Sequence, residues 1–512
     1  MTHNIKILDC TFRDGGYYTN WDFDDKTIDA YIKAMNALPV EYLELGYRNL
    51  PLSEYMGKMG YSPVSALKRI RENCTKKLCV MLDEKNTRPH HLQELLVPIS
   101  GLVEMVRLAV DPKNFDRAVV VAKAVKDMGF EVGFNTMYMS KWNEYDDFVG
   151  RLGRLDGVAD LFCMVDSYGG MMPEEVRDIC HNVKSKMNCA VGFHGHNNLQ
   201  MGLVNTLASI DAGCEFVDAT ILGMGRGAGN VNMELLLTIL NKRGLEVDFN
   251  VLGEVVETFK PLHEKYQWGT NLPYMISGAN SIPQKEVMDW VGNRTYSFNS
   301  IVRALENKKN QVADNARYPV WMAAKANRVL IVGGGPSVIE HCSAIKEFLQ
   351  NNKDLIVVFA TSRHAQLLND IANAKEYCLV GNEAKRMKTQ LDSDTFNGIC
   401  VLPPYPRTMG TEVPEFAENA TFELPEIAFT KSYLDSCTAT ALNCAIEHKA
   451  TEVFVVGYDG YRGAVLSEKE ADLSNENRTL FEDFRTFTGL RLVSLVPTVY
   501  KALNVDSIYK YL

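Results

Sequence analysis

The stretch Ala190-Val-Gly-Phe-His-Gly-His-Asn-Asn198 joins a short apolar segment to a strongly polar tip. A short apolar run bounded by turn-forming residues is typical of a buried strand. Residues 1–240 contain eight such runs, and stretches with helical spacing and charge fill most of the gaps between them. The predicted strands are 5–8, 42–45, 78–82, 103–110, 131–136, 161–165, 190–193 and 216–221.

The alternation of strands and helices predicts right-handed βαβ units and a parallel sheet. Eight such units in this length fit a (β/α)8 TIM barrel, and an open doubly wound sheet is the alternative. We favour the barrel because polar residues follow several different strands, which is where barrel enzymes place their chemistry. The predicted α/β architecture is a barrel over 1–245, a helical lid or linker region over 246–318 and a Rossmann-like domain over 319–512.

Length and composition limit the class of protein. A chain of 512 residues is too long for one ordinary core. Its 54 Lys and Arg against 64 Asp and Glu give a net charge of −10, which argues against a nucleic-acid-binding surface. The apolar runs are too short to span a membrane, and the chain enters a strand at once, so no signal peptide is expected. The twelve cysteines form no CxxC framework, which predicts reduced thiols in a cytoplasmic protein.

Polar side chains at three strand ends predict a metal site. Arg13 and Asp14 follow the first strand, and the glycines after them let the backbone turn sharply. Residues two apart in an extended chain face the same side, so His194 and His196 are expected to point together. A glycine-rich loop ending at Asn230 follows the eighth strand. Each motif alone is also typical of a turn or of core histidines, but together they suit a divalent ion with positions open for substrate.

These motifs, in this order and spacing, resemble the DRE-TIM metallolyase superfamily. It includes 4-hydroxy-2-oxovalerate aldolase, 3-hydroxy-3-methylglutaryl-CoA lyase and the isopropylmalate and citramalate synthases. The motifs are Leu8-Asp-Cys-Thr-Phe-Arg-Asp-Gly15, Leu43-Glu-Leu-Gly46, Val165-Asp-Ser167, His194-Gly-His196 and Gly223-Met-Gly-Arg-Gly-Ala-Gly-Asn230. The histidine motif and the glycine-rich loop are most similar to the 4-hydroxy-2-oxovalerate aldolase branch. The resemblance covers about residues 3–300.

The resemblance implies a ligand set and a chemistry. Asp14, His194 and His196 would bind Mn²⁺ or Mg²⁺, and Asn230 would lie near or on the metal. Arg13 would face the carbonyl oxygen of a 2-oxo acid, where negative charge grows as the carbonyl becomes an enolate.

The general base departs from the aldolase pattern. The aldolases share a histidine shortly after the Arg-Asp-Gly motif, whereas Gly15-Gly-Tyr-Tyr-Thr-Asn20 follows here. The general base must then be another group, and the candidates are Tyr17, Tyr18, Glu44, Tyr274 and a metal-bound water. Glu44 could instead be a solvated or arginine-paired carboxylate. The substrate is therefore expected to differ from 4-hydroxy-2-oxovalerate.

A Schiff-base aldolase is a competing mechanism on the same fold. It needs a desolvated lysine at a strand end. The nearest candidates, Lys85 and Lys141, lie in polar loops, so the metal route is favoured.

The second domain contains the strand, turn and helix start Val329-Leu-Ile-Val-Gly-Gly-Gly-Pro-Ser337. Backbone N–H groups in such a turn can bind phosphate, but the spacing departs from the dinucleotide motif, and the next strand ends in Thr361 instead of an acid. With Gly457-Tyr-Asp-Gly460, the turn resembles the 6-hydroxymethylpterin pyrophosphokinase-like and motility-accessory glycosyltransferase-like families. The implied nucleotide or nucleotide-sugar pocket is lined by Gly335, Ser337 and Asp459. A decayed pocket, an allosteric site and a second active site all stay open.

The first functional hypothesis is a metal-dependent aldolase or lyase acting on a 2-oxo acid and an aldehyde, with a surface-glycan precursor as product class. The second is a Claisen-type acyl-CoA condensing enzyme with the same site. The third is a catalytically silent protein that senses a nucleotide. We expect a homo-oligomer without nucleic-acid or membrane partners.

Overall fold

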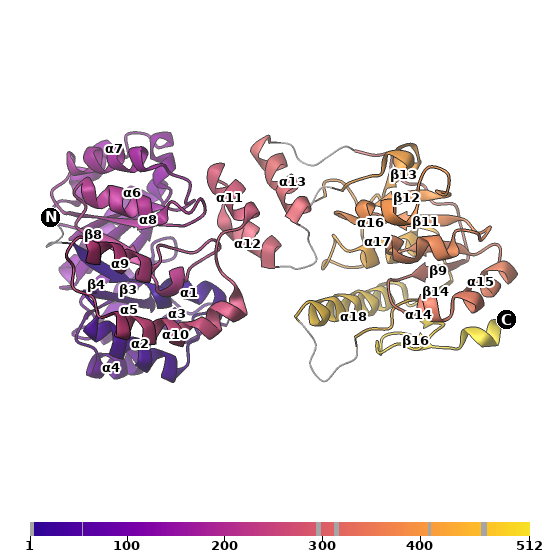
Figure 1. Cartoon of the computed structure of the whole chain (residues 1–512), viewed down its shortest axis with the longest axis horizontal. Helices are drawn as coiled ribbons and strands as arrows, with labels where there is room; N and C mark the ends of the chain where they lie inside the picture. The colour runs from indigo at the N-terminus through magenta and orange to yellow at the C-terminus, as the bar shows by residue number, and fades with distance from the viewer. Residues whose placement is uncertain (1–4, 54, 293–297, 312–316, 408–410, 462–467) are drawn as a thin grey trace. The chain divides into compact units, whose positions relative to one another are not determined.

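The computed structural model describes residues 5–53, 55–292, 298–311, 317–407, 411–461 and 468–512 (Figure 1). The chain divides into two compact units, Met1–Met288 and Asp289–Leu512. The finer predicted boundaries, at 245 and 318, stay predictions.

The first unit is built around a closed barrel of eight parallel strands, coloured indigo to magenta in Figure 1. They are β1 (Lys6–Asp9), β2 (Tyr42–Tyr47), β3 (Lys77–Asp83), β4 (Met105–Val110), β5 (Glu131–Thr136), β6 (Leu161–Asp166), β7 (Ala190–Gly195) and β8 (Phe216–Ala219). All eight predicted strands are present, and the predicted barrel is confirmed. Because β8 pairs with both β1 and β7, the ends of these three strands are neighbours.

Helices surround the barrel, and alternate strand residues divide between two apolar clusters. Ile7 and Val80 belong to the large cluster shared with the helices, whereas Leu8 and Cys79 belong to a separate, smaller one. The two-residue period of a strand puts the smaller cluster inside the barrel. The main connecting helices are α2 (Asp25–Ala37), α4 (Val64–Asn73), α5 (Leu92–Leu96), α6 (Phe115–Asp127), α7 (Pro173–Lys184), α8 (Gly202–Asp211) and α9 (Met233–Lys242).

The Arg-Asp-Gly-Gly motif lies in a helix, α1 (Thr11–Thr19), and the expected sharp turn at its glycines is wrong. An ideal Cβ on Gly15 would lie 2.5 Å from Met224 Sδ, and one on Gly16 would lie 2.1 Å from Trp21 Cδ1. These glycines therefore allow neighbouring side chains to pack closely on the helix.

The described part of the predicted helical region 246–318 is helical. It contains α10 (Phe249–Tyr266), α11 (Leu272–Ala279), α12 (Gln284–Gly292) and α13 (Phe298–Lys309). Helix α11 begins after the segment Trp268-Gly-Thr-Asn271. Asn271 caps this helix, because its side chain accepts a hydrogen bond from Tyr274 N at 3.1 Å. Tyr274 is therefore a helical residue.

The second unit contains a parallel eight-stranded sheet in the order β13-β12-β11-β10-β9-β14-β15-β16. Its strands are β9 (Arg328–Val332), β10 (Ile356–Phe359), β11 (Lys375–Cys378), β12 (Ile399–Leu402), β13 (Thr421–Glu423), β14 (Glu452–Val456), β15 (Leu492–Ser494) and β16 (Asn504–Val505). Since β10 and β14 flank β9 on opposite sides, the strand order reverses beside β9. Ligands of open α/β sheets bind at such a switch point.

After α13, the helices of the second unit are α14 (Ser337–Glu340), α15 (Cys342–Asn351), α16 (Glu383–Gln390), α17 (Cys437–Glu447) and α18 (Glu468–Thr488). The predicted second α/β domain is confirmed as a fold. In the part of the chain that the structure describes, no helix combines the length and apolar character needed to span a membrane.

Candidate active site at the barrel mouth

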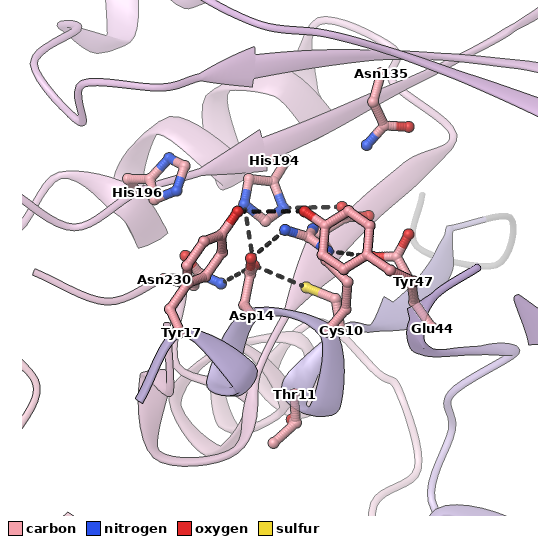
Figure 2. Close-up of polar contacts among 12 residues, drawn as sticks. Cys10, Thr11, Asp14, Tyr17, Glu44, Tyr47, Asn135, His194, His196 and Asn230 are labelled. Carbon is pink, nitrogen blue, oxygen red and sulfur yellow. Dashed lines mark hydrogen bonds and ion pairs between the residues drawn. The ribbon is translucent and has the colours of Figure 1, made fainter. Parts of the chain in front are cut away.

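The carboxylate of Asp14 is contacted by side-chain nitrogen atoms of Arg13, His194 and Asn230 and by the thiol of Cys10 (Figure 2). Its Oδ2 accepts a hydrogen bond from Asn230 Nδ2 at 2.5 Å and lies 3.5 Å from His194 Nε2. Arg13 forms an ion pair with Oδ1. Burial would raise the pKa of Asp14, but Arg13, His194 and His196 lower it below its usual value. Asp14 is therefore an ionised carboxylate.

Both histidines have one ring nitrogen occupied and one left for another partner. His194 Nδ1 lies 2.9 Å from Asp218 Oδ2, and His196 Nδ1 lies 2.8 Å from the carbonyl oxygen of Asp166. Burial, His194 and Arg226 lower the pKa of His196 to about 3, so its ring is neutral. A carbonyl only accepts hydrogen bonds, so His196 Nδ1 donates and the Nε2 lone pair stays available.

Three buried charged side chains form the next layer inside the barrel, above the small apolar cluster. Glu44, Arg107 and Asp218 each follow a member of that cluster by two residues, on β2, β4 and β8. Arg107 donates to Glu44 Oε2 at 3.3 Å, to Asp218 Oδ2 at 2.7 Å and to Asn135 Oδ1 at 2.8 Å. Arg13 Nε donates to the same Glu44 oxygen at 2.8 Å. Opposite charges therefore alternate across the barrel.

Arg107 and Asp218 were not predicted from the sequence as site residues. A charged residue at an inward position of an otherwise apolar strand was the available signal. Burial would raise the pKa of Asp218, but Arg107 and the hydrogen bond with His194 lower it to about 2. An ionised Asp218 holds the His194 ring in one orientation, as outer partners of ligating histidines do.

A cavity of about 410 Å³ lies at this end of the barrel. This volume falls in the range of about 300–1,000 Å³ that is usual for small-molecule sites. Its lining brings together the predicted residues that follow β1 and lie on or just after β7. It includes Arg13, Asp14, Tyr17, His194, His196 and Arg226.

Comparisons with known proteins identify the barrel. The model of the HMGL-like family matches residues 4–258. Oxaloacetate decarboxylase from Mycobacterium tuberculosis is 30% identical over 251 residues, which cover 46% of this chain and 70% of that protein. 4-Hydroxy-2-oxovalerate aldolase from Thermomicrobium roseum is 31% identical over 252 residues, which cover 48% and 69%. The chain belongs to the HMGL-like family.

A solved structure supports the same family assignment. The crystal structure of the N-terminal domain of a candidate aldolase from Bacteroides vulgatus is 66% identical, with a TM-score of 0.56. The match covers 59% of this chain and all of that domain. The resemblance to DRE-TIM metallolyases is therefore confirmed for the HMGL-like barrel, and it includes a relation to 4-hydroxy-2-oxovalerate aldolase.

The HMGL-like barrel holds a candidate divalent-metal site. Donor atoms of Cys10, His194 and Asp218 all lie within 4.8 Å of one another. Burial and Asp14 raise the pKa of the Cys10 thiol well above its usual value, and Cys10 Sγ lies 3.6 Å from Asp14 Oδ2 as a hydrogen-bond donor. Asp218 Oδ2 is already engaged by Arg107 and His194. His194 is the member of this group that also belongs to the predicted ligand set.

The tyrosines considered as bases lie in different places. The hydroxyl groups of Tyr17 and Tyr47 are 3.2 Å apart, and both residues line the cavity. Tyr18 donates to the carbonyl oxygen of Gly227 at 3.1 Å, and burial raises its pKa to about 12. Tyr274 is buried, and its Cε1 would lie 3.3 Å from an ideal Cβ on Gly227. Neither Tyr18 nor Tyr274 is among the described residues that line the cavity, and the catalytic role of Tyr274 stays a prediction.

The candidate Schiff-base lysines are not desolvated. Lys85 lines the cavity but is exposed. Lys141 is partly exposed, and its Nζ lies 3.9 Å from a Glu144 oxygen. A lysine needs burial to lower its pKa enough for such chemistry, so the metal route remains favoured.

In the second unit, the predicted pocket residues lie together beside the switch point. Ser337 Oγ donates to Asp459 Oδ2 at 3.0 Å, and Gly335 N donates to the Gly457 carbonyl oxygen at 2.8 Å. An ideal Cβ on Gly335 would lie 1.8 Å from Asp459 Oδ2. The glycine therefore makes room for a carboxylate, and a phosphate here would need a cation between the two negative groups.

Proposed function

We propose that the barrel is a divalent-metal-dependent aldolase that makes or breaks a carbon–carbon bond next to a 2-oxo acid, through a pyruvate-type enolate. The observation that carries the proposal is that Arg13, Asp14, His194 and His196 line one cavity at the barrel mouth. Two relatives are named for reactions of 2-oxo acids, which supports this substrate class.

Asp14, His194, His196 and Asn230 would hold the ion, Mn²⁺ or Mg²⁺. Both histidines use Nδ1 within the protein, so Nε2 faces the site, where His194 Nε2 lies 3.5 Å from Asp14 Oδ2. Asn230 Oδ1 is buried without a hydrogen-bond partner among the described residues. Imidazole nitrogens with carboxylate and amide oxygens suit such ions better than a protonated thiol does. A bound ion would polarise the oxo group of the substrate as a Lewis acid.

Arg13 would stabilise the negative charge that grows on the oxo oxygen. Glu44 accepts from its Nε, and Asp14 pairs with its NH1, so the guanidinium is oriented before the substrate binds. A cation that is already oriented stabilises developing charge at no reorganisation cost. Glu44 would therefore be a positioning residue that acts through Arg13.

Tyr17 is the proposed proton-handling residue. It follows Asp14 by three residues on α1, and its hydroxyl group lies beside that of Tyr47 in the cavity lining. A hydroxyl pair can pass a proton between the substrate and solvent. Tyr274 is kept as the alternative.

Two other reactions would use the same site. Decarboxylation of oxaloacetate would form the pyruvate enolate with release of carbon dioxide. A Claisen-type condensation would release a free thiol from an acyl-CoA. Assays of pyruvate, carbon dioxide and thiol separate the three reactions.

We also propose that the second unit binds a nucleotide or nucleotide-sugar, together with Mg²⁺, at Gly335, Ser337 and Asp459. Their position beside the strand-order switch point supports this proposal. Such a fusion would suit synthesis of a surface-glycan precursor, and a homo-oligomer is expected. A thermal shift with Mg²⁺ and a nucleotide, reduced in Asp459→Asn, is the expected result. Equal shifts in both proteins would contradict the proposal.

Deuterium exchange into the pyruvate methyl group tests the aldolase proposal without knowledge of the aldehyde. Metal-loaded protein should catalyse exchange, and EDTA should abolish it. Asp14→Asn should lose both exchange and bound metal. Asp116→Asn is the matched control, because Asp116 lies on α6 at the surface in an ion pair with Arg154. Exchange that survives EDTA or Asp14→Asn would contradict the proposal.

A further inference from the structure

Arg226 lies in the glycine-rich loop after β8 and lines the cavity. Its guanidinium carbon is 5.3 Å from the centre of the Tyr17 ring, a cation–π contact that supports the side chain from one side. Two neighbouring glycines leave little freedom to the loop. An ideal Cβ on Gly225 would lie 2.7 Å from the Asn230 side chain, and Gly227 has a φ of +63°.

Among the residues that the structure describes, the guanidinium of Arg226 has no carboxylate partner. Its Nε is buried without a hydrogen-bond acceptor, and within the described ranges no carboxylate forms an ion pair with this side chain. Arg13 and Arg107, by contrast, each contact two carboxylates. Arg226 is only partly buried, but its buried Nε has no acceptor, so a ligand that supplies an anionic oxygen there would be stabilised.

The acids in the cavity lining do not supply that counter-charge. Glu84 is paired with Arg117, and Asp111 is paired with Lys113 at 2.9 Å. Asp83 accepts hydrogen bonds from the backbone of Lys85 and from Asn86. The cavity lining therefore contains two arginines. Carboxylates of the protein balance the charge of Arg13, whereas no carboxylate of the described residues balances that of Arg226.

We propose that Arg226 binds a second anionic group, a carboxylate or a phosphate, on the aldehyde part of the substrate. The enzyme then prefers substrates that carry an anion at both ends. This inference rests on the proposed aldolase function, which places the 2-oxo acid end at Asp14 and the histidines.

The position of Arg226 separates its ligand from the 2-oxo acid end. Tyr17, on which the guanidinium rests, follows Asp14 by three residues, or about one helical turn of roughly 5 Å. A substrate bound at Asp14 would reach Arg226 with its distal carbons. In the synthetic direction, the pyruvate methyl group loses a proton, its carbon bonds to the aldehyde carbon, and the aldehyde oxygen gains a proton. The distal anion is unchanged and contributes binding only.

Binding of two matched oxo acids tests the subsite without turnover. 2-Oxoadipate and 2-oxohexanoate share a six-carbon chain and differ by the terminal carboxylate. Calorimetry on manganese-loaded protein should give about 10- to 100-fold tighter binding of 2-oxoadipate, the range expected of a hydrogen-bonded ion pair. Arg226→Gln should remove this preference, and Arg226→Lys should keep part of it. Arg177→Gln, on the outer helix α7, is the matched control and should keep all of it.

Turnover assays with two pairs of aldehydes test whether the anion bound by Arg226 is a carboxylate or a phosphate. Pyruvate addition to succinic semialdehyde is compared with addition to its methyl ester, and addition to glycolaldehyde phosphate with addition to glycolaldehyde. The larger of the two preferences identifies a carboxylate or a phosphate as the ligand, and Arg226→Gln should lower that preference at least about 10-fold.

Two results would overturn the inference. They are equal binding of the two oxo acids and an unchanged preference in Arg226→Gln. Absence of exchange in the unaltered protein, with the 2-oxoadipate preference intact, would refute the aldolase proposal and leave the anion subsite standing.

Discussion

The barrel mouth and the carboxyl edge of the second sheet both collect polar residues at the ends of parallel strands, yet their surroundings differ. At the barrel mouth, buried charges alternate in sign, and histidine nitrogens and an amide oxygen remain available beside a cavity. At the second sheet, the side chain of Asp459 packs on Gly335 and accepts from Ser337. Parallel strands supply the location in both cases. At the barrel mouth, the buried ion pairs orient the side chains and leave an amide oxygen without a partner among the described residues, whereas at the second sheet the carboxylate is already held by a serine.

The largest effect is expected for Arg13→Gln. Loss of the oriented cation should lower the rate of pyruvate methyl exchange about 10²- to 10³-fold. Metal content should not change, because Arg13 is not a proposed ligand. Exchange followed by proton NMR, with metal analysis of the same sample, measures both. Unchanged exchange would remove Arg13 from the chemistry.

Arg107→Met should be the most destabilising change within the barrel. It leaves Glu44 and Asp218 buried without their shared cation, which costs about 3–5 kcal/mol when one partner of a buried pair is removed. Urea unfolding of the barrel transition measures the loss. Arg154→Gln breaks an ion pair at the surface and should change little. Similar effects of both variants would show that the buried charges do not support the barrel mouth.

Gly335→Ala should destabilise the second unit by about 1–3 kcal/mol. The new methyl group would meet Asp459 Oδ2 at 1.8 Å and the Gly457 carbonyl oxygen at 2.7 Å. The matched control is Gly253→Ala in α10, where nothing lies within 4 Å of an ideal Cβ. That change should stabilise the barrel by about 0.5–1 kcal/mol. A stable Gly335→Ala protein would mean that the close approach of Asp459 and Gly457 to this glycine does not constrain the turn.

The smallest expected effect is a dependence of the stability of the second unit on pH, through His448 and Glu376 in its core. His448 Nε2 lies 2.7 Å from Glu376 Oε1, and His448 Nδ1 lies 2.6 Å from the Ala324 carbonyl oxygen. Burial would lower the pKa of His448, but Glu376, with the Ala324 carbonyl and Glu447, raises it. A raised histidine pKa gives stability that is present below the unfolded value and is lost as the pH rises through the folded value.

Burial raises the pKa of Glu376 as well, and this shift has the same sign, because the folded state again holds protons more tightly. The melting temperature of the second unit should therefore fall between about pH 6 and about pH 8. His448→Gln should flatten this dependence. A melting temperature that rises over this window would contradict the account of the pair.

Much of the fold and part of the site could be predicted from sequence. Eight apolar runs of strand length gave the barrel, since parallel strands buried on both faces are apolar throughout. The two-residue period correctly grouped His194 and His196 at one cavity. Arg107 and Asp218 were missed because a charge in an apolar strand gains its meaning from partners on strands far away in sequence. The helix at Gly15 and Gly16 was missed because tertiary packing overrides the low helix propensity of glycine.

The unpaired state of Arg226 could not be predicted from the sequence either. Its place in a glycine-rich loop was visible in the sequence. Its lack of a carboxylate partner within the described ranges depends on which acids are already paired elsewhere. Glu84 and Asp111 lie in the same cavity and are neutralised by Arg117 and Lys113.

Anomalous diffraction at the manganese absorption edge, from crystals of the manganese-loaded protein, tests the central claim most directly. The account predicts one strong peak at the barrel mouth, bound by Asp14, His194 Nε2 and His196 Nε2, with Asn230 Oδ1 beside it. A peak bound by Cys10 and Asp218, or no peak at the barrel mouth, would contradict the proposed ligand set and the enolate chemistry built on it.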